Sequence, residues 1–319
     1  MKIAVLVLDG VFDTGLATVL DTLTTANDLA GLLGHPGPRF DISIVGVRPA
    51  VRSAQLLGVP VGTVEECPAP DWVIVPAIGI KMPEPLQRAL GRDDVAEAAA
   101  ALRAWAARGT RIAAACVGTF LLAESGLLDQ HEATTTWWLT PLFRQRYPSV
   151  RLDSSRMLVT SGPFVTAGAA LGHIDMALWL IRQVSPELAA LVARYLVVDA
   201  RPSQSAYAIS DHLAHADPLV ERFDRWARQR LDRGFKLDEA AQELATSKRT
   251  LARRIRDVLG KTPVSYVQDL RIEQAVHLLK TSSTSVEAIA GMVGYADGVT
   301  LRALLRRRLG KGIREIRSA

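Results

Sequence analysis

One stretch decides the fold of the C-terminal part of this chain: Ser247-Lys-Arg-Thr-Leu-Ala-Arg-Arg-Ile-Arg-Asp-Val-Leu-Gly260. Ser247 is a good helix N-cap because its hydroxyl can accept a backbone N–H of the first turn. Leu251, Ile255 and Val258 follow at i, i+4 and i+7, which is the spacing of one apolar helix face. The other face carries arginines. The stretch therefore predicts a short helix with an apolar back and a basic front.

The chain around this stretch predicts two similar helical units. Upstream, Leu237–Leu244 predicts a shorter helix, and Thr246-Ser247 predicts a tight turn. The plan recurs about fifty positions later, where Ser285 caps a helix over Val286–Val293. A turn and a second helix follow, whose predicted inward residues are Leu301, Leu304, Leu305 and Leu309. Between the two units, Pro263 starts a long helix predicted over Val264–Lys280.

Two helix-turn-helix units with basic outer faces predict double-stranded DNA as a partner. Residues 218–319 carry 21 Lys/Arg and 12 Asp/Glu, a net charge of +9, whereas the rest of the chain has a net charge of −4. Arg249, Arg253 and Arg302 are the candidates for base edges, because a guanidinium fork matches guanine. The full predicted DNA-binding set is Lys248, Arg249, Arg253, Arg254, Arg256, Val299, Arg302 and Arg306. The alternative is a helical bundle that docks a protein.

Residues 237–317 resemble the AraC/XylS-type DNA-binding domain. The resemblance rests on Ser247-Lys-Arg-Thr-Leu251, Gly260-Lys-Thr-Pro263, Arg271-Ile-Glu-Gln-Ala275, Ser285-Val286, Ile289-Ala290, Gly294-Tyr295 and Arg317, in that order. Two positions depart from the pattern: Leu305 stands where the family usually has phenylalanine, and Ile313 stands where it has proline. The resemblance implies a sequence-specific transcriptional regulator in a bacterial cytoplasm.

The first part of the chain alternates apolar runs with helical patterns, which predicts a parallel sheet covered by helices on both faces. The predicted strands are Lys2–Leu8, Phe40–Val47, Trp72–Ala77 and Arg111–Ala115, and the predicted helices are Leu16–Leu29, Val95–Ala107, Val117–Ala123 and Gly168–Val184. We therefore predict an α/β domain over residues 1–190, a linker over 191–217 and an all-α domain over 218–319.

Cys116 lies in Ala115-Cys-Val-Gly118, between a predicted strand and a predicted helix. Such a sharp turn suits a nucleophile, and the helix N-terminus is expected to lower the pKa of the thiol. The segments around it resemble the PfpI-like, class I amidotransferase-like domain of GlxA-type regulators. They include Asp71-Trp-Val-Ile-Val-Pro76, Ala115–Ala123, Gly126-Leu-Leu-Asp129, Ala133–Trp137 and Ala169–Asp175. The resemblance implies a flavodoxin-like sheet, a homodimer and the sensing of a small molecule.

The residues needed for cysteine catalysis are missing, so we predict that the chain is not an enzyme. Thr136 stands where members of the family carry histidine, and Asp13 is the one acidic residue expected to approach the cysteine. His131 and His173 are interpreted as structural. We expect instead an effector pocket with Cys116 at a vestigial nucleophile position, lined by Asp13, Ala77, Ile78, Cys116, Val117, Thr136 and Trp137. The alternatives are a cysteine-dependent hydrolase or lyase, a redox sensor acting through Cys116, and a domain that only dimerises.

Composition limits the remaining classes. Hydrophobic residues make up 49% of the 319 residues and charged residues 22%, as in a globular protein. No apolar run reaches about 18 residues, so no membrane span is predicted. The two cysteines, Cys67 and Cys116, predict neither a disulfide framework nor a zinc site, and no metal or cofactor is expected.

Overall fold

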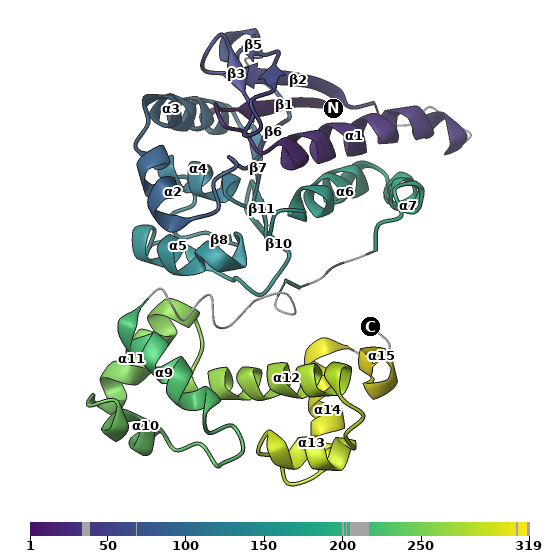
Figure 1. Cartoon of the computed structure of the whole chain (residues 1–319). Coiled ribbons are helices and arrows are strands. Elements are labelled where there is room, and N and C mark those ends of the chain that lie inside the picture. The colour runs from purple at the N-terminus through teal and green to yellow at the C-terminus, as the bar shows by residue number, and fades with distance from the viewer. Residues whose placement is uncertain are drawn as a thin grey trace. The chain divides into compact units, whose positions relative to one another are not determined.

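The computed structural model describes residues 1–33, 39–67, 69–199, 201, 203–204, 217–310 and 312–317. The chain divides into two compact units, Met1–Tyr207 and Ala208–Ala319 (Figure 1). The division falls inside the predicted linker 191–217, of which residues 200, 202 and 205–216 lie outside the described part. Helix α7 (Pro186–Tyr195) crosses the predicted boundary at residue 190, because its Leu188 and Val192 are buried in the first unit. That unit therefore extends further than predicted.

A seven-stranded sheet forms the centre of the first unit, in the order β10-β11-β7-β6-β1-β2-β5. Its strands are parallel except for β10, which pairs with β11 in the antiparallel sense. The bounds are β1 Lys2–Val7, β2 Asp41–Gly46, β5 Gly62–Thr63, β6 Trp72–Val75, β7 Arg111–Ala115, β10 Leu158–Ser161 and β11 Phe164–Ala167. Two small sheets join β3 (Val51–Arg52) to β4 (Gly58–Val59), and β8 (Glu132–Ala133) to β9 (Arg151–Leu152).

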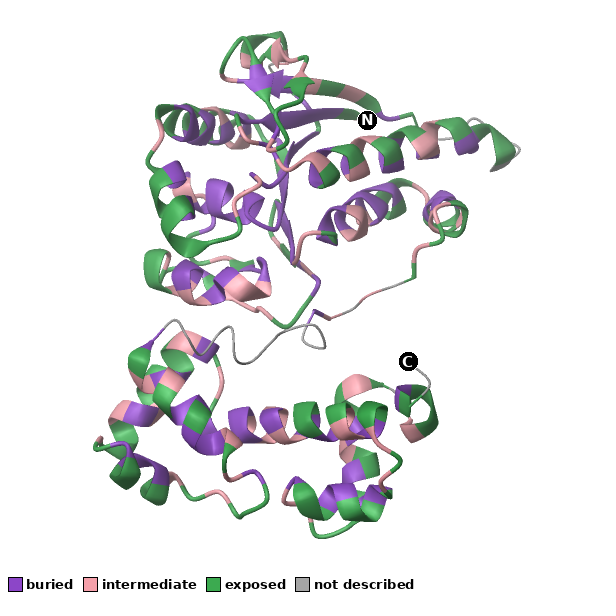
Figure 2. Cartoon of the chain, viewed as in Figure 1, coloured by how far each residue is buried: buried purple, intermediate pink, exposed green. Residues whose placement is uncertain are grey.

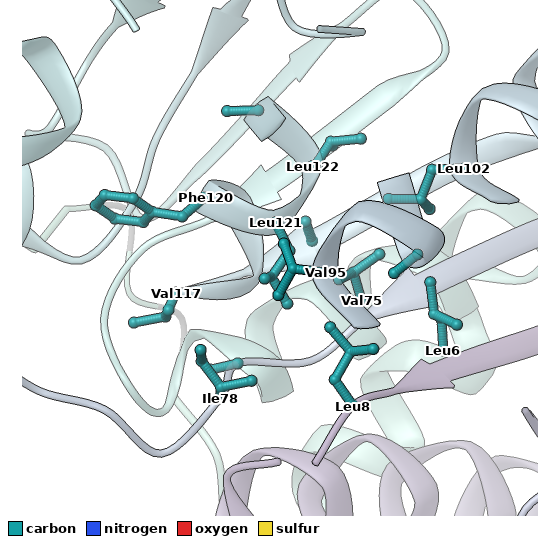
Figure 3. Packing of buried hydrophobic residues seen from close by; sticks show 14 of the residues in the cluster. Leu6, Leu8, Val75, Ile78, Val95, Leu102, Val117, Phe120, Leu121 and Leu122 are labelled. Carbon is teal, nitrogen blue, oxygen red and sulfur yellow. The ribbon is translucent and has the colours of Figure 1, made fainter. Parts of the chain in front are cut away.

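Helices cover both faces of this sheet (Figure 1). Successive residues of β1 point to opposite faces. Ala4 and Leu6 therefore pack with α2 to α5, whereas Ile3 and Val5 pack with α1, α6 and α7. Figure 3 shows the first of these cores, where Leu6 and Val75 from the sheet meet the helices. The bounds are α1 Asp13–Ala30, α2 Pro83–Leu90, α3 Asp93–Ala107, α4 Gly118–Glu124, α5 Thr140–Arg146 and α6 Gly172–Val184, with 3-10 turns η1 Gly31–Leu33, η2 Val64–Glu66 and η3 Trp137–Leu139.

The predicted flavodoxin-like α/β class is confirmed, because every strand foreseen from an apolar run is a strand of the main sheet. The sequence did not reveal the antiparallel edge hairpin of β10 and β11, nor the two-residue strands. Thr160 and Ser161 make the outer strand partly polar, so it lacks the apolar run that marks a central strand.

The second unit is helical, and two hydrophobic cores share its longest helix, α12 (Pro263–Thr281). Tyr266 and Leu270 in the first half of α12 pack with α9, α10 and α11. Ala275 and Leu279 in the second half pack with α13, α14 and α15. The bounds are α9 Pro218–Arg228, α10 Leu237–Glu243, α11 Lys248–Leu259, α13 Val286–Met292, α14 Gly298–Leu309 and α15 Ile313–Arg317. Figure 2 shows the buried residues concentrated on the inner sides of these helices. None of the described helices has the length and apolar character needed to cross a lipid bilayer.

A buried polar network fastens α9 to α12. The carboxylate of Asp224, only 4% exposed, accepts a hydrogen bond of 2.6 Å from the hydroxyl of Tyr266 and one of 2.9 Å from Nε of Arg228. Burial and this carboxylate both raise the pKa of Tyr266, so its phenol stays a donor. The buried carboxylate thus has both a phenol and a guanidinium as partners, and Nη2 of Arg228, which has no hydrogen-bond partner among the described residues, lies 3.6 Å from the carboxylate of Glu273.

Replacing Gly118 tests how tightly the first turn of α4 packs on the sheet. A Cβ at Gly118 would lie 2.2 Å from the backbone oxygen of Val75, and that oxygen cannot move without disturbing β6. We expect Gly118→Ala to destabilise the first unit by about 2 kcal/mol or more in urea unfolding. Gly91→Ala is the control, because its Cβ would meet Arg88 at an ordinary 3.5 Å. Equal unfolding midpoints for the two variants would contradict the expectation.

Candidate nucleic-acid interface and effector site

The first helix-turn-helix consists of α10, a tight turn and α11. Ala245 has a left-handed backbone with φ of +50°, which turns the chain between the helices. The Ser247 hydroxyl accepts the backbone N–H of Thr250 at 3.0 Å, which confirms the predicted N-cap. Leu251 and Ile255 are fully buried on the inner face of α11. The other face is thereby held toward solvent.

The second helix-turn-helix repeats this arrangement with α13 and α14. Gly294, with φ of +75°, ends the first helix, and a Cβ there would lie 2.3 Å from the backbone oxygen of Leu231. Only glycine suits this position, on grounds of both conformation and space. Asp297 caps α14 by accepting the N–H of Thr300 at 2.7 Å. Leu301 is fully buried behind the exposed face of α14.

All the residues predicted to bind DNA are exposed: Lys248, Arg249, Arg253, Arg254, Arg256, Val299, Arg302 and Arg306. Four of them, Arg249, Arg253, Arg256 and Arg306, form no ion pair with any residue that the structure describes. Arg254 differs, because its guanidinium pairs with Asp217, which is 5% exposed and caps α9. Arg254 therefore holds α11 against α9.

Two acidic residues form ion pairs with α11 and α14 that the sequence did not reveal. Asp238 pairs with Lys248 at 2.6 Å, and Glu287 pairs with Arg302 at 2.8 Å. Both acids occupy the second position of the first helix in their unit, α10 and α13. The internal repeat could have revealed the acids, because both helix-turn-helix units have an acid at the second position of their first helix. The cation that pairs with it differs in position, since Lys248 is the first residue of α11 and Arg302 is the fifth residue of α14.

In the first unit, Cys116 occupies the predicted sharp turn between β7 and α4. Its backbone is left-handed, with φ of +56°, a strained conformation for a residue other than glycine. The amide of Cys116 donates to the carbonyl of Ala167 at 2.8 Å, and its carbonyl accepts the Thr135 hydroxyl at 2.7 Å. Hydrogen bonds on both sides therefore hold the strained residue in place.

The expected lowering of the Cys116 pKa is wrong. Burial raises the pKa of this thiol to about 12, against the opposing influence of the Val117 amide and the Thr136 hydroxyl. The side chain is only 4% exposed, so desolvation of a thiolate outweighs two hydrogen bonds to it. At neutral pH the residue is a protonated thiol, not a nucleophile.

We expected the backbone amide of Ala77 to face a ligand, but His173 accepts its N–H instead. Nε2 of His173 accepts the Ala77 N–H at 3.2 Å, and Nδ1 donates to the carbonyl of Ala170 at 2.7 Å. These partners require the neutral ring, and burial lowers the pKa of His173 to about 4. His173 is thus structural, as is His131, whose Nδ1 lies 3.0 Å from the Ser161 hydroxyl.

The predicted effector residues come together only in part. Ala77, Ile78, Cys116 and Val117 share one buried cluster, in which Figure 3 shows Ile78 near Val117. Thr136 is fully buried beside the thiol, and Trp137 is half-buried against Trp138 with ring centroids 5.5 Å apart. Asp13 is engaged elsewhere: its carboxylate accepts the Ser53 hydroxyl and, at 3.1 Å, the Gln55 amide.

A separate hollow of about 630 Å³ opens beyond the carboxyl ends of β1 and β2. Two of its cations are already paired, Arg48 with Glu97 and Arg92 with Asp94. None of the predicted effector residues lines it; the lining is Asp9, Arg48, Pro49, Ala50, Arg52, Arg92, Asp93 and Asp94. Within the described ranges, no group of three or more His, Cys, Asp or Glu side chains is arranged to hold a metal ion.

Known proteins resemble both units. Residues 240–319 match the model of a helix-turn-helix domain family. The transcriptional regulator GbdR of Pseudomonas aeruginosa is 27% identical over 93% of this chain and 78% of its own length. ArgR of the same organism is 27% identical over 68% of this chain and 67% of its own. The chain is thus a helix-turn-helix transcriptional regulator, similar to regulators of the AraC type.

Solved structures support the fold of the regulator's first unit. An AraC family regulator from Pseudomonas putida aligns with 61% of this chain and 98% of its own at a TM-score of 0.51 and 18% identity. A ThiJ/PfpI family protein from Pseudomonas syringae aligns with 70% of this chain and 86% of its own, at a TM-score of 0.50 and 18% identity. The first unit of the regulator thus has the PfpI-like fold that the sequence predicted.

The lowered pKa of His173 predicts that acid destabilises the first unit of the regulator. Between pH 6.5 and 4 the unfolded chain binds a proton at this residue that the folded chain does not. The contribution to stability is therefore complete above pH 6.5 and falls as the pH drops to 4, by at most about 1.4 kcal/mol per pH unit. Urea unfolding midpoints across this range should depend less on pH in His173→Gln than in wild type. Parallel pH profiles for the two, with His131→Gln as the control, would refute this.

The raised pKa of Cys116 predicts a slow reaction with alkylating agents. At pH 8 we expect iodoacetamide to label Cys67, which is half-buried, before Cys116, which should react only after unfolding in urea. Peptide mass mapping after timed labelling distinguishes the two sites. Labelling of folded Cys116 as fast as Cys67 would restore the hydrolase, lyase and redox alternatives.

Proposed function

We propose that this regulator binds a specific operator through α11 and α14 as a homodimer in a bacterial cytoplasm, and responds to a small effector. One observation supports the DNA-binding part of the proposal. An exposed basic helix face recurs in both helix-turn-helix units, which share α12. Such a paired arrangement favours DNA over a single docking surface for a protein. The bacterial relatives support the cytoplasmic setting.

The exposed residues divide into those that read bases and those that hold the backbone. Arg249, Arg253 and Arg302 are assigned to base edges, and the exposed Val299 to a thymine methyl group. Lys248, Arg256 and Arg306 are assigned to phosphates, which orient the protein without carrying sequence information. Arg254 contributes through its pair with Asp217, as a fastening between helices.

The length of α12 supports simultaneous contact of α11 and α14 with DNA. At about 1.5 Å per residue, the helix from Pro263 to Thr281 is roughly 28 Å long. Successive major-groove segments on one face of DNA are about 34 Å apart. Two recognition helices attached along one rigid helix therefore suit neighbouring turns of a continuous site.

The effector part of the proposal concerns the surroundings of Cys116. The hydroxyl of Thr119 is buried and has no hydrogen-bond partner among the described residues, whereas the buried hydroxyl of Thr136 lies beside the Cys116 thiol. Buried polar groups are nearly always paired, so the unpartnered Thr119 hydroxyl, three residues after the strained Cys116, favours a small polar molecule as its partner. Val117 and Trp137 belong to the proposed site. Ala77 and Asp13 have their polar groups engaged by other residues, and catalysis is not part of the proposal.

Selection from randomised duplex DNA at physiological salt, followed by sequencing, tests the DNA-binding proposal. We expect an enriched motif, and affinity that falls as salt increases. Arg302→Ala should relax preference at one base step, at a cost of roughly 1–3 kcal/mol, because a bidentate contact is lost. Arg306→Ala should instead weaken all sequences alike.

Arg182→Ala is the matched control, since Arg182 is an exposed arginine of α6 in the first unit. It should leave both the motif and the affinity unchanged. No enrichment with wild type, or equal loss on all sequences with Arg302→Ala, would count against the assigned roles.

A further inference from the structure

We propose that Glu287 is a positioning residue that sets the base preference of Arg302. The proposal rests on the proposed function, in which Arg302 contacts a base edge. Glu287 lies at the second position of α13, and its carboxylate accepts Nη2–H of Arg302 at 2.8 Å. An arginine held by a carboxylate presents its remaining donors in a fixed direction, so fewer side-chain conformations are lost when it meets a base.

Two contacts favour the charged form of this exposed carboxylate. It interacts with the backbone N–H of its own residue, and this interaction together with Arg302 lowers the pKa of Glu287. Glu287 is therefore ionised at neutral pH, at the second position of α13.

Gly298 makes room for this pair. A Cβ at Gly298 would lie 2.8 Å from Oε1 of Glu287 and 3.4 Å from Nη1 of Arg302. The backbone φ of Gly298 lies outside the left-handed region, so alanine suits its place in the first turn of α14. The absence of a side chain therefore matters for the close approach of Glu287 and Arg302.

The first helix-turn-helix contains a related pair, whose cation lies at a different place on its helix. Asp238 occupies the matching position of α10 and holds Lys248 at 2.6 Å. Recurrence of an acid at this point, in two units whose recognition helices differ in sequence, indicates a common role in orienting a cation of the recognition helix.

Four variants test the proposal by selection and sequencing on the full-length protein. Glu287→Gln removes the charge, and Gly298→Ala displaces the carboxylate while keeping every charge. We expect both to reduce selectivity at the base step that Arg302→Ala identifies, by roughly two- to fivefold, as suits the loss of an exposed ion pair. Glu239→Gln is the control for charge, and Gly291→Ala, with open space around its Cβ, is the control for glycine. Both controls should leave the motif unchanged.

The outcomes separate the explanations. If Glu287→Gln tightens binding equally on all sequences and keeps the motif, the carboxylate only repels DNA and the proposal fails. If Glu287→Gln tightens binding on the operator alone, the acid withholds Arg302 from DNA and the proposal also fails. If Arg302→Ala itself alters no base step, the assigned role of Arg302 is wrong and the positioning role of Glu287 fails with it. Wild-type enrichment together with loss in Arg302→Ala but not in Glu287→Gln or Gly298→Ala would overturn the positioning role alone.

Discussion

The packing of two small hydrophobic cores on one helix is the constraint on which the DNA-binding unit depends. Tyr266, Val267 and Leu270 of α12 belong to one core, and Ile272, Ala275 and Leu279 belong to the other. A helix pair of this size buries too little surface to fold alone. Since α12 supplies the missing apolar surface to both cores, neither helix-turn-helix can form independently of it. The same sharing fixes the direction of each recognition helix relative to the other.

In the first unit, the surroundings of Cys116 are tightly packed. Cys116, whose backbone is strained, and Gly118, which has no room for a Cβ, follow the end of β7. The buried His173 accepts the amide of Ala77, which follows the end of β6. Desolvation dominates the chemistry of this region, because it raises the pKa of Cys116 and lowers that of His173. A fold that elsewhere suits a nucleophile holds a neutral thiol in this chain.

The sequence predicted what depends on local patterns. The caps at Ser247 and Ser285, the apolar face of α11 and the central strands were all visible in residue spacing. Contacts between distant segments were not. His173 lies 96 residues from Ala77, and no local pattern states that its ring accepts that amide. The pKa of Cys116 was predicted in the wrong direction because sequence shows that a helix begins there, but not how completely water is excluded.

The length of α12 also sets the angle between α11 and α14 about the axis of α12. An α-helix advances about 1.5 Å and rotates about 100° with each residue. A single inserted or deleted residue between Leu270 and Ala275 would therefore swing one recognition helix about 100° around the axis relative to the other. Their separation along the axis would hardly change. The number of residues in α12 therefore sets the angle between α11 and α14 about the axis of α12.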